Sequence, residues 1–186
     1  MRIVAGTFRG RPLVAPKGQS TRPTADRARQ AIFNVLEHAA WSPGLEGLRV
    51  IDLYAGSGAL GIEAISRGAA FCLFVDDNAQ SRALIRNNVE AFGLTGSTKI
   101  WRRDATDLGP MSPGAGGPFD LVFLDPPYRK GLIAPALVSL RGGWLAPDAL
   151  LVVETAADED VPPTEGFTML DARAYGETKV TFLRAS

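Results

Sequence analysis

The sequence predicts an α/β fold with a mostly parallel, doubly wound sheet. Short apolar runs of strand length alternate along the chain with segments of helical periodicity. Several apolar runs end at an aspartate, and one leads through a glycine-rich turn directly into a helix. Because parallel strands end at the same edge of a sheet, and ligands of open α/β folds bind at that edge, the aspartates mark a candidate site.

A small appendage is expected to precede the sheet. Two β-like runs at 2–5 and 12–15 flank Arg9 and Arg11, which is typical of a hairpin that carries guanidinium groups outward at its tip. A helix is then expected from about 24 to 39, because apolar residues recur there at helical spacing. The arginines of this helix, among them Arg29, are left to face either the ligand cleft or the solvent.

Length and composition fit an enzyme-sized domain. A turn-rich segment at 41–47 is expected to separate the N-terminal hairpin and helix, residues 1–40, from a core of residues 41–186. With 186 residues and 46% hydrophobic content, the two parts are also compatible with a single domain. The sequence leaves the oligomeric state open, with a monomer as our expectation.

The remaining elements follow the alternating pattern. Residues 109–118 are rich in proline and glycine, which favours a surface connection without regular structure. Strands are expected at 48–51, 69–75, 98–102, 121–124 and 149–154, helices at 62–67, 79–92 and 132–140, and a closing antiparallel pair at 167–174 and 179–183.

Composition excludes several classes of protein and site. No run approaches the roughly 18 apolar residues of a membrane helix, and the start of the chain does not read as a signal peptide, so we expect a cytoplasmic protein with no membrane contact. Cys72 is the single cysteine and His38 the single histidine. Intrachain disulfides are therefore excluded, and zinc sites, other metal sites and Ser-His-Asp or Cys-His chemistry have little support.

The tetrapeptide Asp125-Pro126-Pro127-Tyr128 follows the apolar run 121–124. Two prolines cannot extend a central strand, so the chain leaves the sheet here and displays a carboxylate, a proline carbonyl and an aromatic ring. This set fits a flat base with an exocyclic amine, because the ring can stack on the base while the oxygens accept the amine hydrogens. A plain turn explains the motif equally well when it is taken alone. The candidate catalytic residues are Asp125, Pro126 and Tyr128.

A second motif joins a strand to a helix. Residues 52–61 read Asp-Leu-Tyr-Ala-Gly-Ser-Gly-Ala-Leu-Gly, and their glycines allow the close backbone approach of loops that bind dinucleotide phosphates. Asp52 would repel a diphosphate but attract a cation, so a cofactor with an ammonium and a sulfonium fits better than NAD. The candidate cofactor-binding residues here are Asp52, Tyr54, Gly56, Ser57 and Gly58.

Further acidic residues follow the next two strands. Asp76 stands twenty residues beyond Gly56, the spacing at which a carboxylate accepts hydrogens from ribose hydroxyls. Its alternative role is to cap the following helix, which Asp77 or Asn78 can fill instead. Asp104 can accept from an adenine amine, although a solvated loop aspartate is favoured when this position is judged by itself. The candidates here are Asp76, Asp77, Asp104 and Ala105.

Positive charge is concentrated at the start of a chain whose net charge is zero. Residues 1–38 hold seven basic side chains against two acidic ones, so the remainder is net negative. A phosphate backbone is the natural counterpart, although solvated arginines explain so short a cluster equally well. Phe8 favours RNA slightly, because an exposed ring can stack on bases. The candidate nucleic-acid-binding residues are Arg9, Arg11, Lys17, Arg22 and Arg27.

Three segments, together with the opening residues 1–11, resemble a known family. They are 21–27 (Thr-Arg-Pro-Thr-Ala-Asp-Arg), the glycine loop at 52–61, and 119–128, which ends in Asp-Pro-Pro-Tyr. The family is RsmD, the small-subunit ribosomal RNA guanine-N2 methyltransferases, and the resemblance covers nearly the whole chain. It implies a Rossmann-like class I methyltransferase fold, with a seven-stranded sheet and a C-terminal antiparallel hairpin. It also implies S-adenosyl-L-methionine as cofactor and 16S ribosomal RNA or the assembling small subunit as partner.

The resemblance also implies roles for the candidate residues. In that family the glycine loop holds the amino-acid part of the methyl donor, the residue matching Asp76 holds the ribose, and the residue matching Asp104 lies by the adenine. The target base would lie at 125–128. Many relatives have Phe in place of Tyr54 and Glu in place of Asp76, and both replacements are mild.

Three other functions fit parts of the pattern. A DNA adenine-N6 methyltransferase would use a similar acidic Pro-Pro-aromatic site, but the chain shows no evident extra domain for reading duplex sequence. A nicotinamide-dependent oxidoreductase is disfavoured by Asp52 and by the lack of an obvious catalytic arrangement. A non-catalytic RNA-binding protein would tolerate the loss of Asp125. The sequence leaves open which guanine is modified and whether naked RNA or an assembling particle is the substrate.

Overall fold

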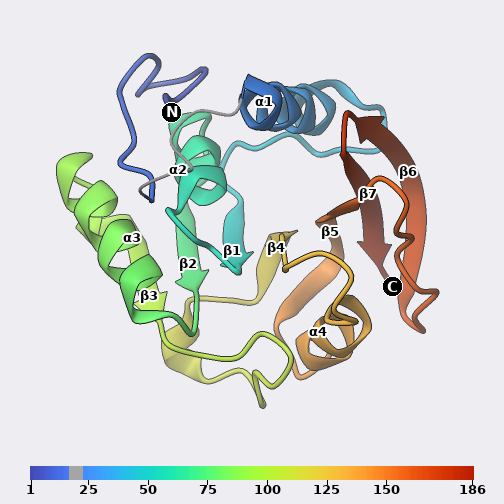
Figure 1. Cartoon of the computed structure of the whole chain (residues 1–186). Helices are drawn as coiled ribbons and strands as arrows, with labels where there is room; N and C mark the ends of the chain where they lie inside the picture. Colours follow the sequence, from blue (N-terminus) through green and yellow to red (C-terminus); the bar gives the residue numbers. More distant parts are fainter. Residues whose placement is uncertain (17–22) are drawn as a thin grey trace.

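A computed structural model describes residues 1–16 and 23–186, which form a seven-stranded sheet with helices on both faces (Figure 1). The strand order is β3-β2-β1-β4-β5-β7-β6. The parallel strands are β1 (Arg49–Leu53), β2 (Phe71–Val75), β3 (Thr98–Trp101), β4 (Phe119–Leu124) and β5 (Leu145–Ala156). The antiparallel hairpin consists of β6 (Phe167–Tyr175) and β7 (Thr178–Ala185). The predicted mostly parallel sheet and its C-terminal hairpin are confirmed.

The helices divide between the two faces of the sheet. One face is covered by α1 (Pro23–His38), α2 (Ala59–Ser66) and α3 (Ala79–Ala91), and the other by α4 (Ile133–Leu140). Because side chains alternate along a strand, β1 serves both layers: Val50 packs beneath α1–α3, and Ile51 packs beneath α4. Burial on both faces explains why the central strands are continuous apolar runs.

Several element boundaries differ from the predicted ones. Helix α2 begins at Ala59, before the expected start at 62, and β5 is longer at both ends than the expected 149–154. Residues 109–118 contain a short 3-10 helix, η2 (Pro113–Ala115), where Ala115 is fully buried. The rest of this segment is exposed or half-buried, as expected of a surface connection. Only the expectation that it contains no regular structure is wrong, because proline and glycine limit the length of an element without excluding a single 3-10 turn. A further 3-10 helix, η1 (Thr95–Ser97), precedes β3.

The N-terminal hairpin forms with few strand contacts. Arg2 and Pro12 make an isolated antiparallel bridge, and the Ile3 N–H donates to the Arg11 carbonyl at 3.0 Å. The two strands expected at 2–5 and 12–15 are reduced to this bridge. Ile3 is buried in the core beneath α1–α3, so apolar packing holds the hairpin against the sheet layer.

A buried ionic network also anchors the N-terminal segment. Glu63 of α2 is fully buried, and its carboxylate accepts from the N–H groups of Val4 at 2.9 Å and Ala5 at 3.2 Å. The same carboxylate pairs with Arg67 at 3.0 Å and with Arg29 at 3.5 Å, so its charge is compensated. Arg29 is 5% exposed, which makes the expectation that it faces the ligand cleft or solvent wrong.

The described residues contain no helix with the length and apolar character needed to cross a bilayer.

Gly61 marks the close contact of α2 with the sheet. A Cβ atom at Gly61 would lie 2.5 Å from Phe74 Cε1 and 2.6 Å from Cys72 Sγ, and both of these side chains are fully buried. We expect Gly61→Ala to lower the free energy of unfolding by about 1 kcal/mol or more. Overpacking costs about 1–3 kcal/mol, which exceeds the gain of at most about 1 kcal/mol from helix propensity. Urea denaturation measures the difference.

Gly96→Ala is the matched control, since a Cβ there meets no atom within 4 Å. Its free energy of unfolding should stay within about 0.5 kcal/mol of the original protein. Equal losses in the two variants would contradict the proposed contact.

Candidate functional site

The structure brings four predicted carboxylates to the same edge of the sheet. The registers place the last residues of β1, β2 and β4 level with one another. Asp76 and Asp125 directly follow β2 and β4, and Asp52 is the penultimate residue of β1. Asp104 lies in the loop that follows β3. The edge is therefore strongly acidic and faces the ligand-binding side of an open α/β sheet.

Two carboxylates fix the glycine loop from opposite sides. The Gly56 N–H donates to Asp76 at 3.0 Å, and the Gly61 N–H donates to Asp52 at 3.1 Å. Tyr54 has φ 56° and Gly56 has φ 60°, so the chain takes a left-handed conformation at both. Because this conformation is unfavourable for a side chain as bulky as tyrosine, the surrounding hydrogen bonds must hold it in place.

Asp76 lies between the glycine loop and α3. Its second carboxylate oxygen accepts from the Asn78 N–H at 2.9 Å, while Asn78 caps α3 by accepting from the Ser81 N–H at 2.9 Å. Asn78, rather than Asp76, therefore caps α3. Asp77, directly beside them, is exposed.

Tyr54 lies among the carboxylates of two loops. Burial, followed by the negative charges of Asp104, Asp77 and Asp76, raises the pKa of Tyr54 to about 12. The phenol is therefore affected by acidic groups of two loops, the loop after β2 and the loop after β3. Asp104 is exposed and accepts hydrogen bonds from the hydroxyl and N–H of Thr106, which lower its pKa and keep it ionised. The neighbouring candidate, Ala105, is buried.

Asp52 and Asp125 share a crowded acidic environment. Asp52 is 1% exposed, and burial raises its pKa well above the ordinary value, with the hydrogen bond from Gly61 opposing the shift and Asp125 and Asp76 adding to it. Asp125 is half-buried, and burial raises its pKa as well. A cationic ligand at this edge would favour the ionised forms of these carboxyl groups.

The Asp-Pro-Pro-Tyr segment is held by the β5 and β7 strands. Pro126 is buried, and the half-buried Tyr128 forms a hydroxyl-to-hydroxyl hydrogen bond with Thr178 at 2.8 Å. Glu154 of β5 hydrogen-bonds with Asp125, and it was not among the predicted site residues. The available signal was its position directly after the apolar run 149–153, the same pattern that marked the aspartates.

The glycine loop leaves room for a ligand. A Cβ at Gly56 would meet only the Tyr54 carbonyl, at 4.0 Å, so the space beside this backbone is open. Carboxylates on both sides of it accept hydrogens from ribose hydroxyls, amines and an ammonium, whereas a diphosphate would be repelled. The residues present fit S-adenosylmethionine, with Asp76 as the candidate acceptor for the ribose and Asp104 for the adenine.

Asn88 links the N-terminal hairpin to the glycine loop. This buried amide of α3 accepts from the Val14 N–H at 2.9 Å and donates to the Val14 carbonyl at 3.0 Å. It also donates to the carbonyl of Ser57 at 2.9 Å. Sequence reasoning missed this role, because an asparagine within a helix gives no indication of a distant backbone partner.

The predicted nucleic-acid-binding residues have different environments. Arg9, Arg11 and Arg27 are all exposed, and the Arg11 guanidinium also donates to the Ala91 carbonyl at 2.7 Å and lies 4.4 Å from the centre of the Phe92 ring. Arg11 is thus less free to move than Arg9, because the end of α3 and Phe92 supply it with a carbonyl and a ring. Phe8, expected to be exposed, is half-buried with its ring centre 5.2 Å from that of Phe92. Lys17 and Arg22 lie outside the described residues.

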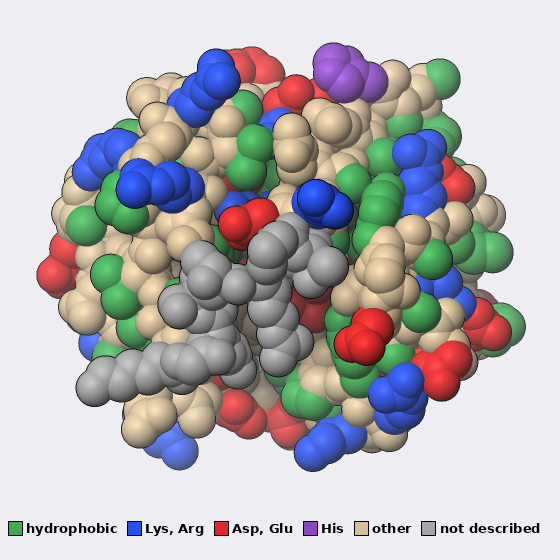
Figure 2. Space-filling view, turned by 45° about the horizontal axis from the view of Figure 1, so that its top comes forward, with side chains coloured by type: hydrophobic (Ala, Val, Ile, Leu, Met, Phe, Trp, Pro, Cys, Tyr) green, Lys and Arg blue, Asp and Glu red, His purple; other side chains and the backbone are tan. Residues whose placement is uncertain are grey.

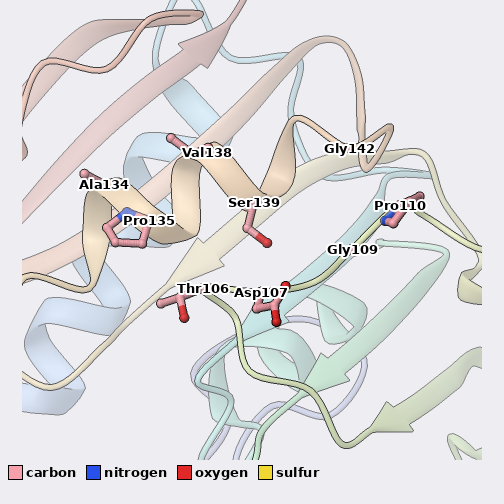
Figure 3. A pocket seen from close by; sticks show the side chains of 9 residues that line it. All are labelled: Thr106, Asp107, Gly109, Pro110, Ala134, Pro135, Val138, Ser139 and Gly142. Atoms are coloured by element: carbon pink, nitrogen blue, oxygen red, sulfur yellow. The ribbon is translucent and has the colours of Figure 1, made fainter.

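The surface carries mixed charge on one face (Figure 2) and a groove beside α4. Figure 2 shows Lys and Arg side chains at separate places on one face, with Asp and Glu side chains among them. An open groove of about 660 Å³ lies between α4 and the loop after β3. Figure 3 shows the side chains that line it. The Leu108 N–H donates to Ser139 Oγ at 2.6 Å along its wall. This groove belongs to the α4 side of the sheet, and we assign it no role.

Comparison with known proteins places the chain in a family. Residues 1–184 match the family model described as conserved hypothetical protein 95. Ribosomal RNA small subunit methyltransferase D of Escherichia coli K12 is 37% identical over 164 residues, covering 87% of this chain and 78% of that protein. The chain belongs to the RsmD family. The Haemophilus influenzae protein of the same name is 32% identical over 178 residues, covering 95% of this chain and 89% of its own.

A solved structure agrees with the RsmD assignment. The Escherichia coli protein yhhF, described as a candidate methyltransferase, superposes with a TM-score of 0.82 at 27% identity, covering 100% of this chain and 98% of that one. The predicted class I methyltransferase fold is confirmed. The RsmD family consists of S-adenosylmethionine-dependent ribosomal RNA methyltransferases, as the resemblance implied.

Asn88→Ala should destabilise the protein and loosen the link to the glycine loop. The change leaves three backbone groups of Val14 and Ser57 without their amide partner. We expect the free energy of unfolding to fall by about 2–3 kcal/mol, because unsatisfied buried polar groups cost about 1–3 kcal/mol each and water enters part of the gap. Urea denaturation measures the loss, and hydrogen exchange at the Val14 amide reports the loosening.

Asn87→Ala provides the control one residue away, because Asn87 is exposed on the same helix. It should change the free energy of unfolding by less than about 0.5 kcal/mol. Unchanged exchange at Val14 in Asn88→Ala would show that the link contributes nothing to order in the hairpin.

Proposed function

We propose that this protein transfers a methyl group from S-adenosylmethionine to the exocyclic N2 amine of a guanine in 16S ribosomal RNA. The observation that carries the proposal is the adjacency of two motifs. The glycine loop follows β1, Asp125 follows β4, and these two strands are paired in parallel with their ends level. A cofactor at the first motif and a base at the second would therefore meet at the same sheet edge.

The residues divide between the two halves of the site. Asp76 and Asp104 would accept hydrogens from the ribose and the adenine, with Asp77 and Ala105 beside them, and Asp52 supports the loop that holds the amino-acid part. Asp125 and the Pro126 carbonyl would accept the hydrogens of the target amine, and Tyr128 would stack on the base. Base–aromatic stacks of this kind contribute about 1–3 kcal/mol.

Asp125 has the central chemical role in this proposal. When bound, S-adenosylmethionine supplies an electrophilic methyl group. The amine nitrogen forms the new bond to the methyl carbon as the carbon–sulfur bond breaks, and the electron pair of the broken bond stays on sulfur. The N2 lone pair of guanine is delocalised into the ring, so acceptors at the amine hydrogens favour the positive charge that develops on nitrogen. Asp125 then takes the proton that the amine releases. Alignment of the two reactants supplies much of the remaining rate.

The N-terminal segment supplies the proposed RNA contact. We assign phosphate binding to the exposed Arg9 and Arg27, within an appendage of residues 1–40, with Lys17 and Arg22 as further candidates. The relatives named for ribosomal RNA small subunit methylation support this choice of nucleic acid. We further propose that the protein is a monomer and that it acts in the cytoplasm on the RNA or on the assembling small subunit.

Asp125→Ala should abolish methyl transfer while donor binding survives. The loss should exceed about 100-fold in kcat, because acceptors and proton-transfer groups each contribute on that order. Transfer of labelled methyl groups to small-subunit RNA measures the rate, and nucleoside analysis separates N2-methylguanosine from N6-methyladenosine. The latter product would favour the DNA adenine-N6 type of chemistry.

Asp76→Ala is the complementary variant for the same experiment. It should weaken donor binding about 10-fold or more in calorimetry, because a hydrogen bond to a charged group contributes about 1.5–3 kcal/mol. If Asp125→Ala lost donor affinity instead, Asp125 would belong to the cofactor half of the site.

Arg9→Ala should weaken RNA binding and reduce its salt dependence. Removal of one phosphate contact lowers the slope of log K against log salt by about 1. Arg11→Ala should lower that slope less, because its guanidinium is held against the end of α3 and is less free to reach a phosphate. Filter binding at several salt concentrations compares the two, and an unchanged slope in Arg9→Ala would remove the hairpin from the RNA footprint.

A further inference from the structure

Glu154 lies beside the proposed base-binding carboxylate. The register pairs Leu124 of β4 with Val153 of β5, so the next residues, Asp125 and Glu154, are level on neighbouring strands. Residues two positions earlier on each strand belong to the core beneath α1–α3, and side chains alternate along strands. Asp125 and Glu154 therefore project on the same side of the sheet, where they hydrogen-bond to each other.

Few charges compensate this pair. The charged groups that face Glu154 are Asp125, Asp52 of β1 and Arg29 of α1. Arg29 is already paired with Glu63 at 3.5 Å and with Asp26 at 3.3 Å. On the other side, the β7 residue paired with Glu154 is Val180, which carries no charge. Arg29 therefore offsets only part of the negative charge around Glu154.

A hydrogen bond between two carboxyl groups requires a proton between them. Because the two carboxyl groups lie side by side with little solvent around them, they cannot both be ionised without strong repulsion. Burial raises the pKa of Asp125, and the hydrogen bond from Glu154 opposes that rise. Burial and then the charge of Asp125 raise the pKa of Glu154 well above its ordinary range. We therefore assign the shared proton to Glu154 and the remaining negative charge to Asp125.

We propose that Glu154 is a positioning residue which, in its protonated form, donates its O–H to one oxygen of Asp125 and orients the other oxygen toward the target amine. The inference rests on the proposed function, since it gives Asp125 its role at the base. It extends that function by naming a residue of β5 which touches neither base nor donor and which sets the charge and orientation of the acceptor.

Proton balance follows from this arrangement. Before transfer, the pair holds one proton, on Glu154. The methylated amine releases one proton to Asp125, the pair then holds two and is neutral, and one proton leaves to water before the next turnover. Ionisation of Glu154 at high pH would replace the donated hydrogen bond by repulsion between two carboxylates, and Asp125 would lose its orientation.

Glutamine and alanine at this position separate the possibilities. Glu154→Gln keeps an N–H donor for Asp125 but cannot ionise, so kcat at neutral pH should remain within about threefold of the original enzyme. Glu154→Ala removes the donor and should lower kcat about tenfold or more, with the donor Kd unchanged within about threefold. Comparable losses in the two variants would overturn the proposal.

The pH dependence of kcat gives a second reading. In the original enzyme kcat should fall as the pH rises through the pKa of Glu154, and this fall should be absent in Glu154→Gln. A fall of the same size and position in both proteins would assign it to another group and overturn the proposed role of Glu154.

Titration of the carboxyl groups by carbon-13 NMR tests the pair without any methyl transfer. With glutamate side chains labelled, one resonance should titrate well above the ordinary glutamate range of about 4.3 and be missing in Glu154→Gln. Glu90→Gln, at an exposed site, should leave that resonance in place. If Glu154 titrated in the ordinary range in a protein that methylates RNA, the proposed Asp125–Glu154 pair would be wrong and the proposed function would stand. If Glu154 titrated well above the ordinary range in a protein that methylates no RNA, the proposed function would be wrong and the Asp125–Glu154 pair would stand.

Discussion

The parallel register of the central strands is the constraint on which the site depends. Strands β2, β1 and β4 lie side by side with their carboxyl ends level, and β5 runs parallel beside β4. Asp76 and Asp125 directly follow β2 and β4, Asp52 is the penultimate residue of β1, and Glu154 lies on β5 level with Asp125. Strand spacing fixes the separation of these groups at about 5 Å per strand, close enough for each charge to influence the next. The two buried layers beneath α1–α3 and α4 keep the strands from shifting apart.

This arrangement costs stability at neutral pH. Asp52, Asp125 and Glu154 all have raised pKa values in the folded protein. A carboxyl group with a raised pKa binds its proton more tightly in the folded than in the unfolded state, so the free energy of unfolding falls as the pH rises from the ordinary carboxyl range through the folded-state pKa. The hydrogen bond from Gly61 to Asp52 offsets part of that cost.

Sequence reasoning reached the sheet, the hairpin and the acidic edge because each depends on local pattern. Apolar runs define buried strands, and a residue that ends such a run must lie at the sheet edge, so Asp76 and Asp125 were predictable from position alone. Glu154 follows the same rule but was not singled out, since no distinctive motif surrounds it. The charge state of the Asp125–Glu154 pair was beyond prediction, because it depends on which two strands are neighbours.

Long-range contacts account for the other differences. Arg11 and Arg29 are arginines in polar surroundings by sequence, and only the fold shows that α3 supplies a carbonyl to one and α2 a buried carboxylate to the other. The pairing of Asn88 with Val14 spans 74 residues and involves backbone groups, which carry no residue-specific pattern. Side-chain identity predicts which groups can pair, whereas topology decides which of them meet.

The contacts of α2 and α3 give the N-terminal hairpin a direct connection to the glycine loop. Glu63 of α2 binds the backbone at Val4 and Ala5, and Asn88 of α3 binds both Val14 and Ser57. Both helices flank the glycine loop, since α2 begins directly after it and α3 follows Asp76. A displacement of the hairpin would thus reach the glycine loop through buried hydrogen bonds, which resist displacement because an unsatisfied polar group in the interior is costly.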